Sequence, residues 1–174
     1  MTWTRCLAWL AIALLVPGSL AHAANAAAAW WGIAWPDVII AIEGSIRTAT
    51  SVMFIGWFFL CYRQARREHP DRMRWRSAWA IAGFLIPGVG IVVPYLLTRD
   101  LWRSTISNSL GLPRLWWTAF TAGNVLWMAG AGIPDVMYTW PRALPVTREG
   151  FWALSGAFSI VLIRSIMNAG TRSR

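Results

Sequence analysis

Two charged residues at helical spacing, Glu43 and Arg47, are the first candidates for chemistry in this 174-residue chain. They lie four positions apart with the glutamate first, an order that lets the two side chains pair on one face of a helix. Both border or enter an apolar segment, where an unpaired charge is costly and charged residues commonly line an ion or substrate path. Two interpretations follow: a structural ion pair, with Arg47 reaching toward the membrane surface, or a site for cargo or protons.

Two further polar residues are candidates for a site. Asp100 lies between Arg99 and Arg103. It either pairs with these neighbours and fixes a helix at the membrane surface, or acts as a polar clamp that holds together the two ends of the apolar segment before it. Asn124 lies in the middle of an apolar run and needs a hydrogen-bond partner, for which backbone carbonyls near Pro87 are candidates. We expect Asn124 to join helices or, alternatively, to bind a ligand.

The residue types that most enzymes use are scarce. The two histidines, His22 and His69, lie in a small-residue stretch and in an arginine-rich segment. The sequence contains no HExxH, CxxC, GxSxG or phosphate-binding glycine-loop pattern. Cys6 and Cys61 are expected to be reduced packing residues. We therefore expect no enzymatic activity, no metal and no cofactor.

The composition is that of an integral membrane protein. Hydrophobic residues make up 57% of the chain and charged residues only 13%, whereas a soluble domain has about 25% charged residues. About 20 apolar residues make one crossing, so the chain is expected to be a single all-α membrane domain over residues 1–174. All sixteen basic residues are arginine, and they flank apolar runs instead of lining one basic face. Nucleic acid is therefore not an expected partner.

The apolar runs predict four transmembrane helices, at 6–31, 40–62, 115–132 and 151–167. An outer loop is expected at 133–150 and a short basic tail at 168–174. The first segment has a second interpretation, because Arg5, the apolar run after it and Ala21-His22-Ala23 have the pattern of a signal peptide with its cleavage site.

An arginine-rich segment, 63–76, sets the expected orientation. Loops rich in arginine stay on the cytoplasmic side of the membrane. These side chains are also expected to contact anionic lipid headgroups, at about 1 kcal/mol each near the surface. They are Arg63, Arg66, Arg67, Arg72, Arg74 and Arg76.

The segment 77–98 is long enough to cross the bilayer as one helix, but proline and glycine interrupt it at Pro87-Gly88. The alternative is a re-entrant pair of half-length helices, which keeps most arginines on the cytoplasmic side; we favour it for that reason. The next segment, 99–114, is then expected as an interfacial amphipathic helix with Leu101 and Trp102 toward lipid. The C-terminus would be cytoplasmic.

The middle of the chain, 52–117, resembles domain of unknown function 4328, a family of bacterial membrane proteins that is common in actinobacteria, so the expected location is a bacterial plasma membrane. The resemblance is carried, in order, by Phe54, Trp57, Arg63, Arg66, Trp79, Pro87, Pro94, Tyr95, Asp100, Trp102, Arg103, Ser104, Trp116 and Trp117. Two positions depart from the family pattern. Gly90-Ile91-Val92 stands where the family usually has Asn-Leu-Trp, and Arg67-Glu68 where it usually has an asparagine after the arginines.

The resemblance implies a multi-span membrane protein that keeps its first helix. It implies no activity, because none is established for the family. Within the shared motif, the candidate polar or structural site residues are Pro87, Pro94, Tyr95, Asp100, Trp102 and Arg103.

Three functions remain open on this basis. Missing catalytic groups and small-residue faces such as Ala119-xxx-Gly123 favour a non-enzymatic accessory or scaffold component, packed against another membrane protein or a second copy. The alternative is a small transporter or channel that uses the broken segment, with Glu43, Arg47 and Asn124 along its path. The third is a lipid-modifying enzyme with Asp100 at headgroup level.

Overall fold

Long apolar stretches of the sequence form long helices in the computed structural model, which describes residues 3–33, 36–86, 89–106, 109–132 and 143–172. Over these residues the chain is helical and has no strands. The elements are α1 (Trp3–Trp31), α2 (Asp37–Glu68), the short 3-10 helix η1 (Pro70–Arg72), α3 (Trp79–Leu85), α4 (Val89–Thr105), α5 (Gly111–Gly132) and α7 (Ala143–Arg172).

Three of these helices contain segments long and apolar enough to cross a membrane: Thr4–Trp31, Ala41–Glu68 and Ala143–Ala169. They include three of the four predicted spans. The fourth, in α5, forms a helix of 22 residues but is not among these segments, because asparagine, threonine, glycine and tryptophan dilute its apolar character. The prediction of an all-helical fold with helices able to cross a membrane is therefore confirmed for three helices.

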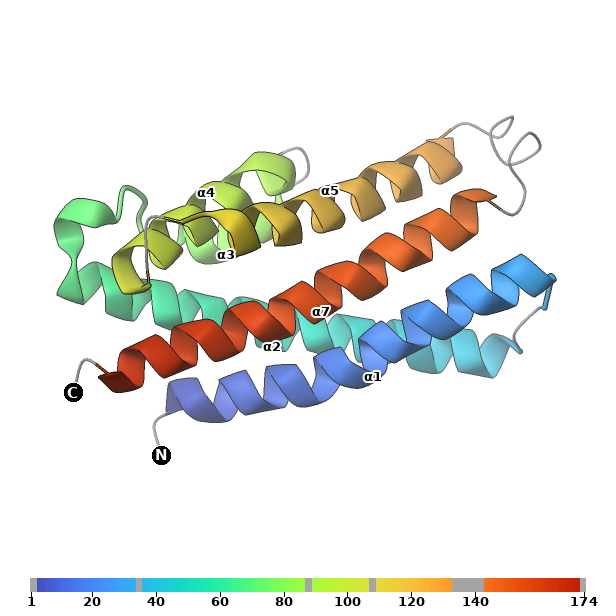
Figure 1. The fold of residues 1–174 in the computed structure, drawn as a ribbon, viewed down its shortest axis with the longest axis horizontal. Coiled ribbons are helices and arrows are strands. Elements are labelled where there is room, and N and C mark those ends of the chain that lie inside the picture. Colours follow the sequence, from blue (N-terminus) through green and yellow to red (C-terminus); the bar gives the residue numbers. More distant parts are fainter. Residues whose placement is uncertain (1–2, 34–35, 87–88, 107–108, 133–142, 173–174) are drawn as a thin grey trace.

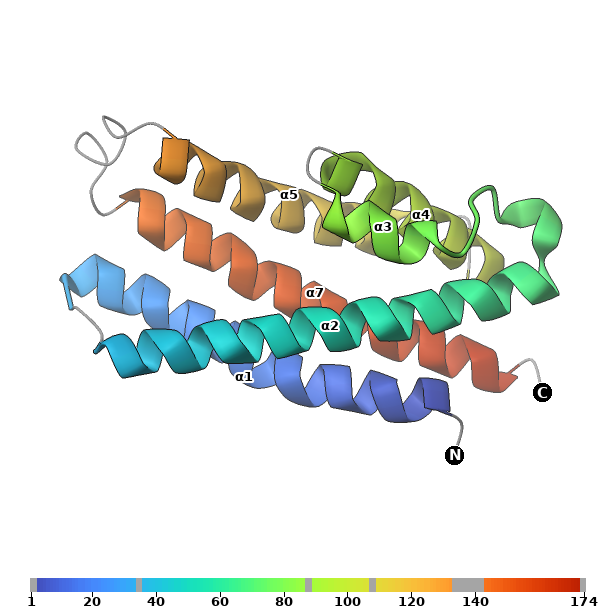
Figure 2. The ribbon, with the colours of Figure 1, turned by 180° about the vertical axis from the view of Figure 1, so that it is seen from behind.

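The long helices lie lengthwise beside one another (Figures 1 and 2). α7 packs against both α1 and α5, and α1 also packs against α2. The start of α1 and the end of α7 lie at the same end of this bundle, which is also where α2 ends (Figure 1). Ala8 and Ala11 of α1 are fully buried in the common core, so α1 is an integral part of the bundle.

Segment 77–98 folds as two helices, α3 and the first part of α4, which together with the rest of α4 we call the α3–α4 hairpin; the expected break at Pro87-Gly88 lies outside the described residues. α3 and α4 lie side by side and run only part of the way along the bundle (Figures 1 and 2). They approach closely at Gly83, where an added Cβ would lie 2.6 Å from Val93 Cγ1. Ile86 has the extended backbone that a residue before proline favours, while Pro87 itself lies outside the described residues.

Aromatic side chains attach this hairpin to its neighbours. Phe84 of α3 meets Phe54 and Phe58 of α2 edge-on, with ring centroids 6.0 and 5.6 Å apart. Tyr95 of α4 stacks on Trp117 of α5 at 5.8 Å. The end of α3 is thus fixed against the middle of α2, which matters for the cavity described below.

The prediction of a separate interfacial helix at 99–114 is wrong. Residues 99–105 are the last two turns of α4, and α5 already begins at Gly111. Leu101 is fully buried and Trp102 is 7% exposed, so neither faces lipid. The helix continues past Pro94 because its buried face, which includes Leu97 and Leu101, packs into the bundle core.

The predicted outer loop at 133–150 is also too long. α7 begins at Ala143, so residues 143–150 are its first two turns. Pro145 is compatible with this position, because the first turn of a helix has no intrahelical partners for its N–H groups. The earlier start places Glu149 inside the bundle instead of in a loop.

Candidate functional site

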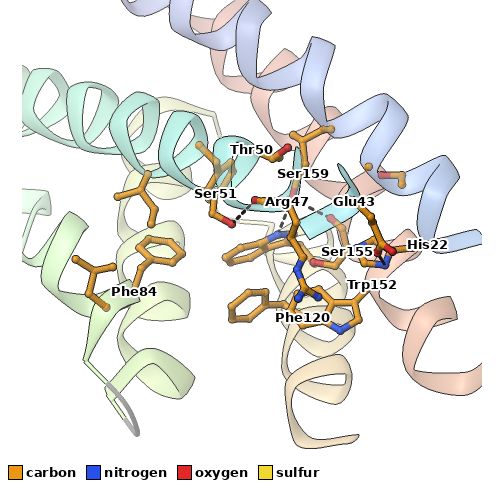
Figure 3. A pocket seen from close by; sticks show the side chains of 18 residues that line it. His22, Glu43, Arg47, Thr50, Ser51, Phe84, Phe120, Trp152, Ser155 and Ser159 are labelled. Carbon is orange, nitrogen blue, oxygen red and sulfur yellow. Dashed lines mark hydrogen bonds and ion pairs between the residues drawn. The ribbon is translucent and has the colours of Figure 1, made fainter. Parts of the chain in front are cut away.

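A partly open cavity of about 310 Å³ lies among α1, α2, α5, α7 and the end of α3 (Figure 3). Its apolar walls include Phe54, Phe84 and Phe120. Its polar lining comes mainly from three helices and comprises Ser19, His22, Glu43, Arg47, Thr50, Ser51, Ser155 and Ser159. The end of α3 therefore closes one side of a mainly apolar hollow, which polar side chains line from three helices.

Helical spacing explains how the polar side chains gather on this cavity. Ser19 and His22 are three apart on α1, and Glu43, Arg47 and Thr50 are four and three apart on α2. On α7 the same face carries Ser155 and Ser159, four positions apart. Residues at these spacings share one face of a helix, so three polar faces meet at one place.

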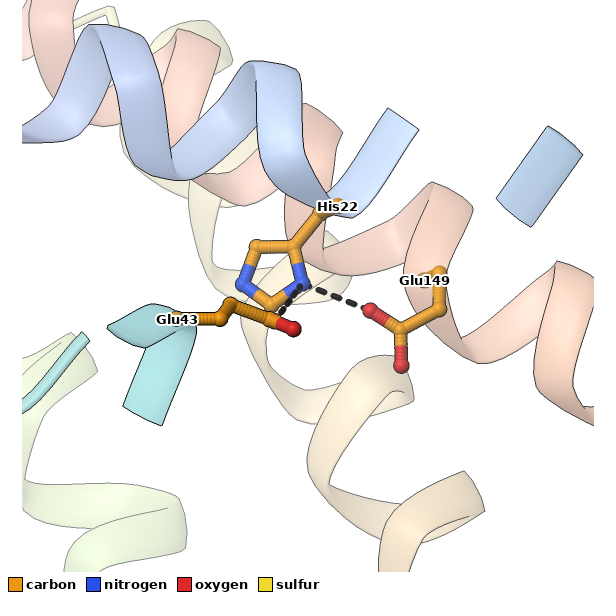
Figure 4. Close-up of side chains that lie close together, drawn as sticks. All are labelled: His22, Glu43 and Glu149. Carbon is orange, nitrogen blue, oxygen red and sulfur yellow. Dashed lines mark hydrogen bonds and ion pairs between the residues drawn. The ribbon is translucent and has the colours of Figure 1, made fainter. Parts of the chain in front are cut away.

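Beside the cavity, His22, Glu43 and Glu149 converge from α1, α2 and α7 (Figure 4). We call them the His22–Glu43–Glu149 cluster. The imidazole Nδ1 of His22 lies 2.6 Å from Glu149 Oε2 and 3.7 Å from Glu43 Oε1. His22 and Glu149 are each 7% exposed. The cluster is thus a buried contact between one imidazole and two carboxylates.

Two neighbours orient the carboxylates of the cluster. Asn25 Nδ2 donates to Glu43 Oε2 at 2.7 Å. Arg148 donates to Glu149 Oε1 through Nε at 2.9 Å and Nη2 at 2.6 Å. In each glutamate, therefore, one oxygen is held from outside while the other faces the same imidazole nitrogen.

Glu43 and Arg47 do not form the pair expected from their spacing. The Glu43 side chain turns toward α1, where His22 and Asn25 are its partners. Among the residues that the structure describes, the Arg47 guanidinium has no ion pair or hydrogen bond. The Arg47 side chain points into the cavity, on the side of Phe120 and Trp152 (Figure 3).

The Asp100 region occupies the part of α4 nearest the end of the bundle that carries the chain termini (Figure 1). Asp100 is 4% exposed, and its Oδ1 accepts from Arg99 at 3.1 and 3.3 Å. Its Oδ2 is buried and has no hydrogen-bond partner within the described part of the chain. Arg103, the other expected neighbour, is exposed. Asp100 is therefore buried within the protein.

The other motif residues near Asp100 have packing roles. Trp102 Nε1 donates to the Ser109 carbonyl at 2.7 Å, which ties the end of α4 to the chain just before α5. Pro94 is buried, and Tyr95 stacks on Trp117 as described above.

Asn124 does not reach the hairpin. Its Nδ2 donates to the Phe120 carbonyl of its own helix at 2.8 Å, and it does not line the cavity. Of the three residues expected along a transport path, the structure brings Glu43 and Arg47 together on the cavity and leaves Asn124 outside.

The arginine-rich segment is mostly exposed. Arg66 is the exception, because its Nη1 donates to the Trp75 carbonyl at 2.6 Å and so fastens the loop to the end of α2. The exposed side chains, for which headgroup contact stays a prediction, are Arg63, Arg67, Arg72, Arg74 and Arg76.

Sequence reasoning missed His22 and Glu149. The predicted span 6–31 contains His22, but this residue was weighed only as part of a possible cleavage site, and Glu149 was assigned to a loop, so neither was considered as a site residue. A histidine within an apolar segment is itself a signal of function. The three-residue spacing from Glu149 to Trp152 and on to Ser155 would also have placed the glutamate on the polar face of α7.

Comparison with known protein families supports the resemblance that the motif at 52–117 indicated. No curated protein and no solved structure matches the chain. The family described as Domain of unknown function (DUF4328) matches residues 21–171, a range that takes in the Asp100 region, most of the residues that line the cavity and all three residues of the His22–Glu43–Glu149 cluster. The chain therefore belongs to the family Domain of unknown function (DUF4328).

Proposed function

We propose that this chain is a multi-pass protein of a bacterial plasma membrane that binds a small amphipathic anion inside its bundle, as a solute transporter does. The observation that carries the proposal is Arg47. It lies within a segment apolar enough to cross a membrane and lines the cavity without a partner among the described residues. A charge at membrane depth is expensive and is kept where it serves a path or a ligand.

The chemistry of the cavity fits an anion with an apolar body. The carboxylate of Glu43 is engaged by His22 and Asn25, so the positive charge of Arg47 is the one left for a ligand. Hydroxyls of Ser19 and Thr50 add hydrogen-bonding capacity nearby. The remaining walls are aromatic and aliphatic, as in most small-molecule sites.

In this proposal α1, α2, α5 and α7 cross the membrane and the α3–α4 hairpin re-enters. α5 runs lengthwise beside α7, and the hairpin begins and ends at the end of the bundle where the chain termini lie (Figure 1). The arginine-rich segment 63–76 lies at that same end, which the positive-inside rule assigns to the cytoplasm.

Cysteine labelling tests this threading. In a Cys6→Ala, Cys61→Ala background, Arg76→Cys and Arg103→Cys are expected to react with an impermeant thiol reagent only after cell lysis. Ile33→Cys, at the far end of α1, is expected to react in intact cells. If Arg76→Cys and Arg103→Cys report opposite sides, the segment crosses the membrane and the re-entrant hairpin is wrong.

Photo-crosslinking tests the binding site. Purified protein in nanodiscs would be exposed to a diazirine derivative of dodecanoate, with dodecanoate and dodecanol as competitors. We expect labelled peptides from α5 and α7, competition by dodecanoate only, and at least about a tenfold loss of labelling in Arg47→Gln, the scale of about 1.4 kcal/mol. Arg67→Gln, an exposed arginine on the same helix, is the matched control.

Equal labelling of Arg47→Gln and Arg67→Gln would contradict an anion site and would mean that Arg47 only extends toward the membrane surface. It would also favour the accessory or scaffold role, which makes no use of the cavity. If the anion binds, movement of labelled dodecanoate across vesicles with and without the protein decides whether binding leads to transport.

A further inference from the structure

We propose that the His22–Glu43–Glu149 cluster binds one divalent transition-metal ion, of the zinc class, through His22 Nδ1 and one oxygen of each glutamate. The proposal goes beyond the anion site in the cavity, because the ligand is different and its binding can be measured without any anion. It also goes against the expectation from the sequence that the chain holds no metal.

The donor atoms are already gathered. One donor atom from each residue lies within 4.8 Å of the others, and the two contacts of the imidazole Nδ1 are 2.6 and 3.7 Å. Donors bound to one zinc ion at about 2.0–2.2 Å lie about 3–3.5 Å apart. Small rotations of three side chains on fixed helices are enough to reach that arrangement.

The neighbours of the cluster have the positions that second-layer groups take around metal ligands. Asn25 holds the distal oxygen of Glu43, and Arg148 holds the distal oxygen of Glu149. Hydrogen bonds of this kind fix the orientation of a ligating carboxylate and usually affect metal affinity strongly. His22 is further restrained by Trp152, which stacks on it with ring centroids 6.1 Å apart.

Charge also favours a divalent ion. The two carboxylates offset the two positive charges of the ion; with the Arg148 guanidinium on Glu149, the bound group carries one net positive charge, less than the ion alone would bring into an apolar bundle. Metal binding through Nδ1 would replace the 2.6 Å contact between His22 Nδ1 and Glu149 Oε2.

The donor set narrows the kind of ion. An imidazole nitrogen with carboxylate oxygens suits zinc, cobalt, manganese or ferrous iron, whereas calcium and magnesium prefer oxygen alone and cuprous copper prefers sulfur. Three protein ligands leave at least one coordination position open. His22 and Glu43 both line the cavity, so this open position is reached from there.

The test uses full-length, tag-free protein in detergent, stripped with a chelator and then dialysed. Cobalt, which absorbs visible light when bound by nitrogen and oxygen ligands in a tetrahedral site, is the probe, and zinc is the competitor. We expect one cobalt per chain, displaced by one zinc. His22→Ala and Glu149→Gln should each weaken zinc binding at least about 100-fold, beyond the 10–100-fold typical of second-layer changes.

Controls separate a specific site from general effects. His69→Ala and Glu68→Gln, both exposed at the end of α2, should bind cobalt like the wild type. Because His22 and Glu149 are buried and their variants could fail to fold, Glu43→Gln is the milder test; its side chain is 22% exposed. Each variant would be compared by circular dichroism before metal is added.

Two outcomes would overturn the proposal. In the first, wild-type protein shows no cobalt absorption and no saturable zinc binding, which would make the cluster a metal-free hydrogen-bond network. In the second, folded Glu43→Gln binds as tightly as wild type. Arg47→Gln should keep full metal affinity, so failure of the anion site leaves the metal proposal standing.

Discussion

Two buried acidic regions of the bundle differ in where their partners come from. Asp100 takes its hydrogen bonds from Arg99, its neighbour in sequence, and leaves Oδ2 without a partner among the described residues. In the His22–Glu43–Glu149 cluster every carboxylate oxygen faces a donor or the imidazole, and the contact between His22 and Glu149 joins positions 127 residues apart. The cluster therefore depends on the tertiary fold, whereas Asp100 depends on its own helix.

This difference has an energetic consequence. A carboxylate that already lacks a donor on one oxygen gives up little when its charge is removed, because its burial is costly in any case. A carboxylate that joins an imidazole and an arginine leaves both of them without a partner when it is lost. The two regions should respond differently to the same chemical change.

The largest expected effect is on stability. In chelator-treated protein, Glu149→Gln should lower the free energy of unfolding by about 3 kcal/mol, because it breaks a buried charged network. Asp100→Asn, the same change in the other region, should cost less than about 1 kcal/mol. Unfolding in mixed micelles of increasing SDS content, followed by circular dichroism, measures both. Equal losses would mean that the two regions are equivalent and that the cluster adds no network energy.

The second-largest expected effect is that of metal removal on stability, which should depend on the His22–Glu43–Glu149 cluster and not on Asp100. With zinc at a hundred times its dissociation constant, bound metal adds about 2.7 kcal/mol to the stability of the folded state. Adding EDTA should therefore lower the unfolding midpoint of the wild type and of Asp100→Asn equally. Glu43→Gln should show almost no change with EDTA. A drop in Glu43→Gln as large as in the wild type would place the metal elsewhere in the protein.

The third test concerns the local partner of Asp100. Arg99→Ala leaves both oxygens of a buried carboxylate without a donor, so it should cost about 1–2 kcal/mol. Arg103→Ala, an exposed position one turn further on, should stay within about 0.5 kcal/mol of the wild type. The same micelle unfolding assay applies. If the two variants lose the same amount, Arg99 does not act through Asp100.

The contrast between the regions also explains what the sequence could and could not predict. The division of segment 77–98 into two helices, α3 and α4, was predictable because proline and glycine act on their own few residues. The helix through Leu101 and Trp102 was not, because burial in the bundle overrides an amphipathic pattern that fits a membrane surface equally well. Pro145 was taken for a loop residue although the first turn of a helix accepts it.

The candidate site, too, was predictable only where it depends on neighbours in sequence. Glu43 and Arg47 were predicted because their spacing is local, and both do line the cavity. The partners of Glu43 were not predictable from spacing, because Asn25 and His22 belong to another helix. No local rule indicates which face of α1 meets which face of α7, and the cluster exists only where those faces meet.

The smallest expected effects, on stability and on zinc affinity, come from two asparagines that both lie within predicted apolar spans, Asn25 and Asn124. The side chain of Asn124 donates to the backbone carbonyl of Phe120 in its own helix. In a helix this carbonyl also accepts a backbone hydrogen bond, so it does not depend on Asn124. Asn124→Ala should therefore change stability by less than about 0.5 kcal/mol, since alanine favours the helix and offsets the lost bond. Asn25 instead holds Glu43 in place, so Asn25→Ala should weaken zinc binding about tenfold, while Asn124→Ala leaves it unchanged. Zinc titration of both variants decides the matter, because a purely structural role for Asn25 would lower stability without moving the zinc affinity.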